Sequence, residues 1–165
     1  MKNAAMQKIN EYLDQTGRLA FFAFRFFKQA FSRPFEFREF IRQCFLIGYH
    51  SLLLVALTGF IMGVVLDMQV RPTLIDFGAV SYMPALVGIS IVREIGPVVT
   101  ALICSGKIGS SIGAELGSMK VTEQIDAMEV SGTNPFKYLV VTRIWATTLM
   151  LPVLVVFSDA IGLWG

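Results

Sequence analysis

The chain has 165 residues, of which 55% are hydrophobic and only 16% are charged. Soluble domains carry about 25% charged residues, and a soluble fold of this length has too little interior to bury so much apolar surface. The mean hydropathy of +0.64 also excludes an intrinsically disordered chain. The composition therefore predicts a membrane protein.

Basic residues are concentrated at the N-terminus. Residues 1–43 carry eight bases and four acids, a local charge of +4, whereas residues 44–165 carry six bases and eight acids, a local charge of −2. A basic segment of this kind suits either nucleic acid or the anionic surface of a membrane. Six phenylalanines interleave with the bases between residues 21 and 31. They favour the membrane and argue against nucleic acid.

Residues 19–31 have the periodicity of an amphipathic helix. Arg18, Arg25 and Gln29 fall on one stripe, and apolar side chains cover the other side. This pattern is typical of a helix that lies in the membrane interface, the alternative being a core-facing helix of a soluble domain. Pro34 is expected to end the helix. We therefore assign residues 1–43 to interfacial or elbow helices.

Three apolar stretches are long enough to cross a bilayer as helices, which takes about 20 residues. They make residues 44–165 a polytopic membrane domain whose spans lie at about 45–66, 79–104 and 138–165, with a small-residue extension of the second span to 117. Polar connections at 67–78 and 107–137 separate them. The inner segments carry eight plus three bases against one, Arg71, in the outer connection. The N-terminus is therefore expected in the cytoplasm.

Nothing in the chain has the spacing of a metal or catalytic site. Cys44 and Cys104 lie 60 positions apart in apolar surroundings and are expected to be small buried residues. His50, alone in the first span, is expected to be a hydrogen-bonded residue rather than a ligand. Lys107 follows a glycine, but the remainder of a Walker A motif is missing. We expect no metal, no cofactor in this chain and no enzymatic activity.

Arg93 and Glu94 stand together inside the second apolar stretch, directly before Gly96-Pro97. Two ionised residues near the centre of a span cost roughly 5–7 kcal/mol, which cancels most of the gain from the neighbouring aliphatic side chains. Pro97 has no N–H for the carbonyl of residue 93, so the helical hydrogen bonding is expected to open there. Charge beside a disrupted helix predicts a substrate cavity. A structural salt bridge between helices is the alternative.

Small residues line one face of the segment that follows. Gly109, Gly113 and Gly117 recur every four residues, a pattern that lets helix backbones approach closely. We expect this face to pack against another helix, either within a subunit or across a dimer.

Residues 118–130 are predicted to form a short cytoplasmic helix. An apolar stripe and an acidic edge run along it, made respectively by Val121, Ile125 and Met128 and by Glu123, Asp126 and Glu129. A one-sided helix between two spans suits docking into a groove of a soluble partner. The alternative, an amphipathic helix on the membrane, is disfavoured because the inner leaflet is itself negative.

Long runs of this sequence resemble the MlaE-type ABC transporter permeases. They are REIGPVVTAL at 93–102, GKIGS at 106–110 and AELGSMKVTEQIDAME at 114–129, with the Asn134-Pro135 turn and Arg143 also fitting. The resemblance implies a multi-pass subunit of the bacterial inner membrane that works as a homodimer with cytoplasmic ABC ATPases, which bind the ATP. It further implies a periplasmic MCE-domain partner and a phospholipid or related lipid as substrate. Family members continue through two more spans, so the chain looks C-terminally truncated relative to the family.

We therefore predict a permease subunit that moves phospholipids between the inner and outer membranes and so maintains outer-membrane lipid asymmetry. The expected cavity residues are Arg93 and Glu94, for head groups or gating, and Leu66, Leu74 and Phe77, for lipid tails. Residues 119–130 are expected to couple the cavity to the ATPase. A non-transporting scaffold subunit is the alternative, and a membrane enzyme acting on lipid phosphates is disfavoured because no cluster of Asp, His or Ser supports it.

Overall fold

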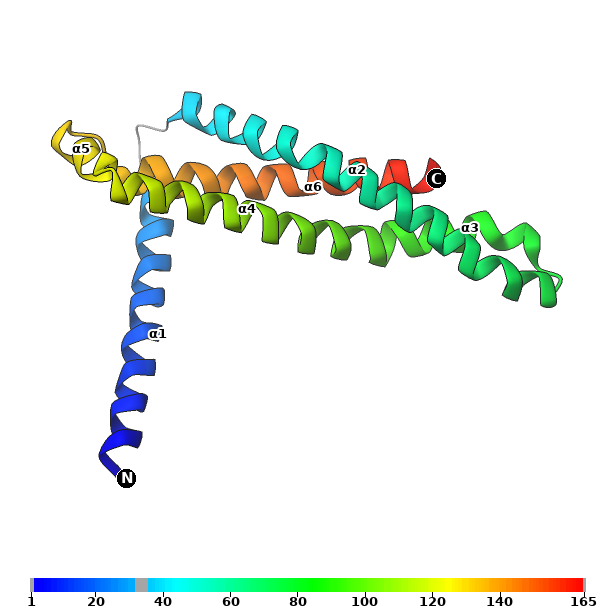
Figure 1. Cartoon of the computed structure of the whole chain (residues 1–165), viewed down its shortest axis with the longest axis horizontal. Helices are drawn as coiled ribbons and strands as arrows, with labels where there is room; N and C mark the ends of the chain where they lie inside the picture. Colours follow the sequence, from blue (N-terminus) through cyan, green and yellow to red (C-terminus); the bar gives the residue numbers. More distant parts are fainter. Residues whose placement is uncertain (1, 32–35, 165) are drawn as a thin grey trace.

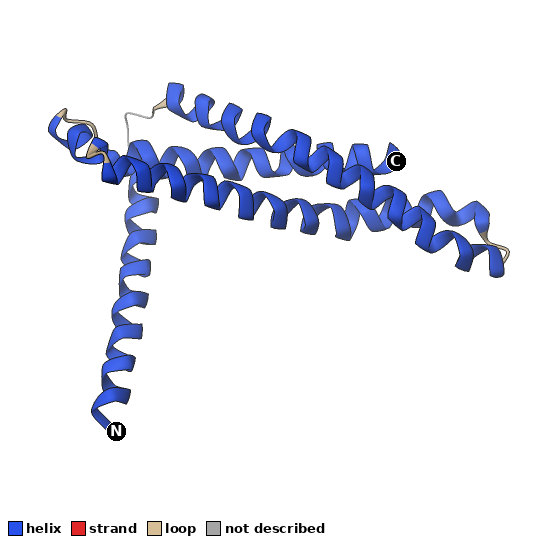
Figure 2. Cartoon of the chain, in the orientation of Figure 1, coloured by secondary structure: helices blue, strands red, loops and turns tan. Residues whose placement is uncertain are grey.

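The computed structural model describes residues 2–31 and 36–164, with side chains from Leu13 onward, and all regular structure in these ranges is helical (Figures 1 and 2). Six α-helices follow one another: α1 (Lys2–Ala30), α2 (Phe37–Asp76), α3 (Met83–Ser90), α4 (Gly96–Val121), α5 (Gln124–Val130) and α6 (Thr142–Trp164). Three short turns join them, the 3-10 turn η1 (Val80–Tyr82) and the π-helical turns η2 (Ile91–Ile95) and η3 (Lys137–Val141). The all-α prediction is confirmed.

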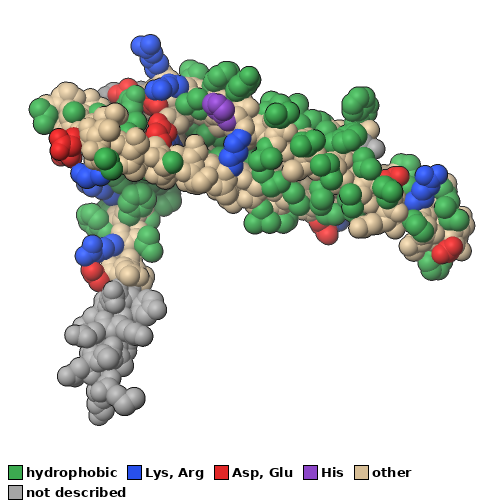
Figure 3. All heavy atoms as spheres, viewed as in Figure 1, with side chains coloured by type: hydrophobic (Ala, Val, Ile, Leu, Met, Phe, Trp, Pro, Cys, Tyr) green, Lys and Arg blue, Asp and Glu red, His purple; other side chains and the backbone are tan. Residues whose placement is uncertain are grey.

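Three helical segments in the described ranges are long and apolar enough to cross a membrane. They are Phe37–Asp76, Val80–Val121 and Lys137–Trp164. They match the three predicted spans, and on the face shown in Figure 3 apolar side chains cover much of the bundle while most charged ones lie toward its two ends. The chain is thus built as a polytopic membrane protein.

The long helices α2, α4 and α6 run side by side, and α1 stands across one end of this bundle (Figure 1). A core of aliphatic side chains and one thiol joins the three: Ile47, Val55, Cys104, Ile108, Ala146 and Leu154. Cys104 is buried, as predicted, and Cys44 is half-buried. Nδ1 of the exposed His50 donates a hydrogen bond to the carbonyl oxygen of Leu46 at 3.0 Å, which confirms that this histidine is hydrogen-bonded.

The first span is longer than the sequence indicates. The predicted polar connection at 67–78 is helical up to Asp76, so α2 has 40 residues and is about 60 Å long. A Schellman motif ends it: the N–H of Ala79 donates to Leu74 O at 2.9 Å, that of Gly78 donates to Ile75 O at 3.0 Å, and Gly78 has φ +64°. Helix termination therefore follows the left-handed glycine and not the first polar residue.

Helices α2 and α6 pack through small residues. A Cβ on Gly59 would come within 2.7 Å of the carbonyl oxygen of Ser158, and a Cβ on Gly63 would overlap the backbone of Gly162. The GxxxG pattern in α2 thus faces a small-xxx-small pattern in α6, an arrangement that brings membrane helices close together.

The glycine face of α4 behaves differently from this pair. A Cβ on Gly109, Gly113 or Gly117 would meet no atom of the described chain within 4 Å. Packing of this face within the subunit is therefore not realised in the described chain, because α4 contacts α2 and α6 through the stripe that carries Cys104 and Ile108. Packing across a second copy stays a prediction.

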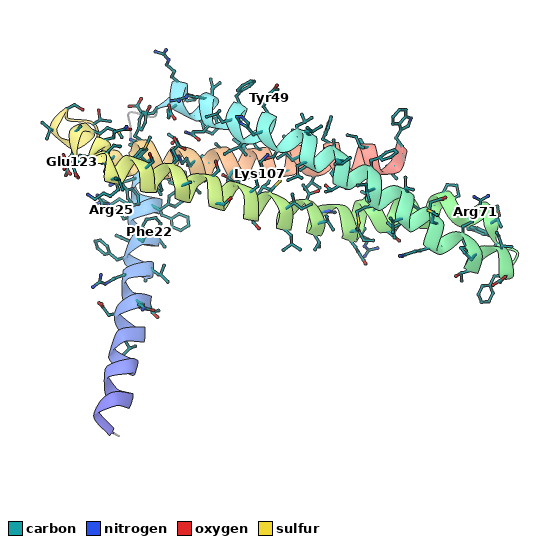
Figure 4. The ribbon with its side chains drawn as sticks, in the orientation of Figure 1. Phe22, Arg25, Tyr49, Arg71, Lys107 and Glu123 are labelled. Atoms are coloured by element: carbon teal, nitrogen blue, oxygen red, sulfur yellow. The ribbon has the colours of Figure 1, made fainter. Side chains whose placement is uncertain are left out.

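Helix α1 is attached to the bundle near its C-terminal end. The ring of Phe22 meets that of Phe136 edge-on with centroids 5.2 Å apart, and the guanidinium carbon of Arg25 lies 4.7 Å from the same ring centroid. Figure 4 shows Phe22 and Arg25 at this junction. Other phenylalanines of α1, including Phe21, Phe24 and Phe27, are exposed. An uncovered apolar face agrees with a helix in the membrane interface and disagrees with a core-facing helix. The predicted break at 32–34 lies outside the described residues.

Candidate functional site

The charged pair of the second span sits on a π-helical turn. In η2 (Ile91–Ile95) the N–H of Gly96 donates to the carbonyl of Ile91, five residues back. Pro97, which follows, has no N–H to continue the α-helical pattern. The expected disturbance of hydrogen bonding is therefore present, but as a widened turn inside a continuous helix rather than as a break. Such turns are frequent at functional sites.

The two sides of η2 have different surroundings. Ile91 and Gly96 are buried against the bundle, whereas Arg93 and Glu94 are exposed. Within the described chain neither of these two forms a hydrogen bond or an ion pair. The alternative of a structural salt bridge is thus not realised in this part of the protein. Because charged side chains are costly in lipid, this face of η2 requires water, another protein surface or a polar ligand.

Asp159 of α6 is a candidate site residue that the sequence alone did not single out. Its side chain is 8% exposed, and its Oδ1 has no hydrogen-bond partner among the described residues. A Cβ on Gly96 would overlap this carboxylate, so the glycine is what lets α6 approach the π-helical turn. A lone acid in a span is a functional candidate by default. That signal was available, since no other acidic residue follows residue 129.

The predicted tail contacts are spread along α2. Met62 shares a small void with Ile91 and Ile95 and so marks the level of η2 on α2. Leu66 is one turn beyond Met62, about 6 Å, whereas Leu74 and Phe77 are about 18 Å and 22 Å along the helix. Leu74 is buried, and Phe77 is 79% exposed at the tip of the α2–η1–α3 hairpin. The described chain therefore places Leu66 within one helical turn of the level of η2 and does not gather all five residues around one cavity.

A second polar cluster ties the helices together at the α1 end of the bundle. Arg143, 3% exposed, forms an ion pair at 2.8 Å between its Nη2 and Oε2 of Glu115. Nearby Glu39 of α2 accepts hydrogen bonds from Gln43 Nε2 at 2.8 Å and from the Tyr138 hydroxyl at 2.9 Å. These contacts link α4 to α6 and α2 to η3.

The predicted helix at 118–130 is divided in two. Helix α4 continues to Val121, and α5 begins only at Gln124 because Glu123 adopts a left-handed conformation with φ 55°. Ile125 and Met128 are half-buried, but Val121 is 85% exposed and lies before the turn. The three residues therefore do not form one stripe of a single helix. Lys120 Nζ lies 3.2 Å from Asp126 Oδ1 across the turn.

Comparison with known proteins places the chain. A family profile described as "Permease MlaE" matches residues 40–165, which includes all three apolar segments and the π-helical site. The chain belongs to the MlaE permease family. Its relatives in this family are named as transporter permeases. The region that the family profile matches, residues 40–165, includes both η2 and α5.

Relatives in the MlaE family come from several bacteria. The chain is 42% identical over 125 residues to the intermembrane phospholipid transport system permease protein MlaE of Haemophilus influenzae, covering 76% of this chain and 48% of the relative. It is 37% identical over 163 residues to a probable ABC transporter permease protein of Rickettsia felis, covering 99% and 63%. A probable ABC transporter permease protein of Synechocystis is 38% identical over 128 residues, covering 78% and 49%. The chain thus spans about half to under two thirds of these relatives.

Proposed function

We propose that the chain is the membrane-spanning subunit of an ABC transporter that moves phospholipids between the inner and outer membranes and thereby maintains outer-membrane lipid asymmetry. The observation that carries this proposal is the 42% identity to a phospholipid transport permease across a region that presents Arg93 and Glu94 unpaired on a π-helical turn. A lipid head group with a phosphate and an amine would complement these two side chains.

In this proposal α1 lies along the cytoplasmic surface of the inner membrane. Phe136 contacts α1, and Ser158, at the level of η2, is 22 residues further along, which is about 33 Å of helix. The hydrocarbon core is about 30 Å thick. The charged pair would therefore lie toward the periplasmic surface and not at the centre of the bilayer, and the hairpin tip at Phe77 would extend beyond it.

In the proposed mechanism this chain binds lipid and transmits movement, and it forms or breaks no covalent bond. Arg93 can hold a phosphate through two parallel hydrogen bonds, and Glu94 can accept from an ammonium group. ATP bound by a partner ATPase would close that subunit against α5. Helix α4 connects α5 directly to η2, so a push at α5 would reach the head-group residues through one continuous element.

The proposed partners follow from the same arrangement. A second copy of the chain would cover the exposed charged faces of η2 and the open glycine face of α4. Cytoplasmic ABC ATPases would dock at α5, and an MCE-domain protein would receive or deliver lipid at the periplasmic hairpin. No cofactor is assigned to this chain.

Substitution of two exposed valines tests the docking surface proposed for the ATPase. Val121 is the last residue of α4 and Val130 is the last residue of α5, and their side chains are 85% and 90% exposed. A partner that covers them would gain apolar contact without disturbing the bundle. Val121→Asp combined with Val130→Asp should reduce co-purification of the ATPase at least tenfold while the spans remain folded. Ile125→Asp is less clean because Ile125 is half-buried.

Val80→Asp is the matched control, since Val80 is exposed at the opposite end of the bundle. It should leave ATPase binding unchanged. Undiminished co-purification with the double variant would remove the docking assignment of residues 119–130.

The lipids that co-purify with the complete complex test the proposed substrate. Mass spectrometry of the complex extracted in mild detergent should find phospholipid retained in a fixed ratio to the permease. A lower ratio of phospholipid to permease in Arg93→Ala or Glu94→Ala would support the site. A complex that retains no phospholipid would favour the scaffold function instead.

A further inference from the structure

An apolar groove runs along the outside of the bundle between α4 and α6, and Gly109 is the one residue of the predicted sites that lines it. Its volume is about 470 Å³. Aliphatic side chains form most of its walls, among them Ile108, Ile112 and Leu116 of α4, Leu139 of η3, and Ile144 and Leu151 of α6. Phe22 of α1 also lines it, so the groove reaches the interfacial helix.

The dimensions of the groove suit one hydrocarbon chain. From Ser105 to Leu116 it follows 11 helical steps, so it is about 17 Å long and its mean cross-section is roughly 28 Å², equivalent to a channel about 6 Å wide. A methylene chain, whose carbons approach their neighbours at about 4 Å, fits it.

A buried cation lies in the wall of the same groove. Arg143 is 3% exposed, and its Nη2 forms the ion pair with Glu115. Its Nε and Nη1 have no hydrogen-bond partner among the described residues. Buried donors without an acceptor are rare in proteins and point to a bound ligand, ion or water. Arg143 stands one turn from Leu139, near the α1 end, and two turns from Leu151. An anionic head at Arg143 and a tail toward Leu151 therefore fit the groove in one orientation.

Further cations surround the α1 end. Arg25 stacks on Phe136 beside Phe22, and Lys28 follows on the next turn of α1. Figure 4 shows Arg25 beside Phe22 where α1 meets the bundle. Positive charge at the level where the groove ends is what a phosphate-bearing lipid requires.

We propose that this groove binds a phospholipid, with one acyl chain between α4 and α6 and the phosphate at the Arg143 end. The site is separate from the transport site proposed above and does not rest on it, because Arg143 and Ser158 are 15 residues apart on α6, about 22 Å. Its ligand comes from the leaflet in which α1 lies.

Photolabelling of the protein purified with everything that assembles on it tests this site. The probe is a phosphatidylglycerol with a diazirine at the end of one acyl chain, and its partner probe is the diacylglycerol with the same chain. We expect the phospholipid to label peptides covering 105–116 and 139–151, and to do so at least threefold more than the diacylglycerol. Equal labelling by both probes would overturn the assignment of the phosphate to Arg143.

Filling the groove from either wall should remove the label. Gly109 and Thr148 line the groove, and a Cβ on Gly109 meets nothing within 4 Å. Gly109→Leu and Thr148→Leu should each lower groove labelling at least fivefold. Gly106→Leu is the control, because Gly106 is equally open but does not line the groove. Labelling retained in both filled variants, or absent from the unaltered protein, would overturn the proposal.

Discussion

Replacing Gly63 by alanine should destabilise the bundle more than any other single methyl group. The new Cβ would overlap the backbone of Gly162. A helix backbone cannot move aside as the end of a flexible side chain could. Overpacking of this kind costs about 1–3 kcal/mol in free energy of unfolding. It should appear as a lower thermal midpoint of the detergent-solubilised protein, even though alanine is intrinsically about 1 kcal/mol better than glycine in a helix.

Gly106→Ala is the matched control, since the same methyl group there meets no described atom within 4 Å and Gly106 is not part of the glycine face assigned to a second copy. Its helix propensity should leave the midpoint unchanged or raise it. Equal destabilisation by both variants would mean that the α2–α6 contact is not what sets the stability of the bundle.

Removing either charge of the η2 pair should abolish transport without loss of protein. Arg93→Ala and Glu94→Ala should each reduce lipid transport at least tenfold, measured as outer-membrane barrier function, because each side chain is exposed and unpaired in the described chain and so is free to meet a head group. Membrane abundance, measured in the same strain, should stay within twofold of the unaltered protein.

Arg38→Ala and Glu36→Ala are the controls, because they remove exposed charges of the same signs at the start of α2, the end opposite the hairpin. They should leave transport intact. A structural ion pair behaves otherwise: loss of one member strands a buried charge and costs about 3–5 kcal/mol. Abundance that falls together with activity would therefore contradict the head-group role.

The sequence predicts the spans and the interfacial helix well because their signals are local. A run of 22 uncharged residues at 45–66 must be helical in lipid whatever lies beside it. The phenylalanine face of residues 19–31 likewise indicates only that one side of the helix contacts an apolar environment. Neither inference needs knowledge of which helices are neighbours.

The contacts that depend on neighbours were the ones the sequence could not provide. Two glycine faces were present, one in α2 and one in α4, and only the arrangement of α6 decides that Gly59 and Gly63 are buried while Gly113 is open. The burial of Asp159 against Gly96 joins residues 63 positions apart. Spacing along one helix carries no information about such a pair.

The boundaries of α5 were wrong for a different reason. Periodicity places Val121, Ile125 and Met128 on one stripe, but the left-handed Glu123 turns the chain between the first and second of them. A non-glycine residue rarely takes this conformation, so no residue type marks the turn in advance.

Transfer of labelled phospholipid by the reconstituted complex tests the central claim most directly. The permease, with its ATPase, is placed in donor liposomes, and lipid is followed to an acceptor membrane or lipid-binding protein with and without ATP. The account predicts transfer that requires ATP and is lost with Arg93→Ala while ATPase binding is retained. A complex that assembles and hydrolyses ATP but transfers no phospholipid would contradict it.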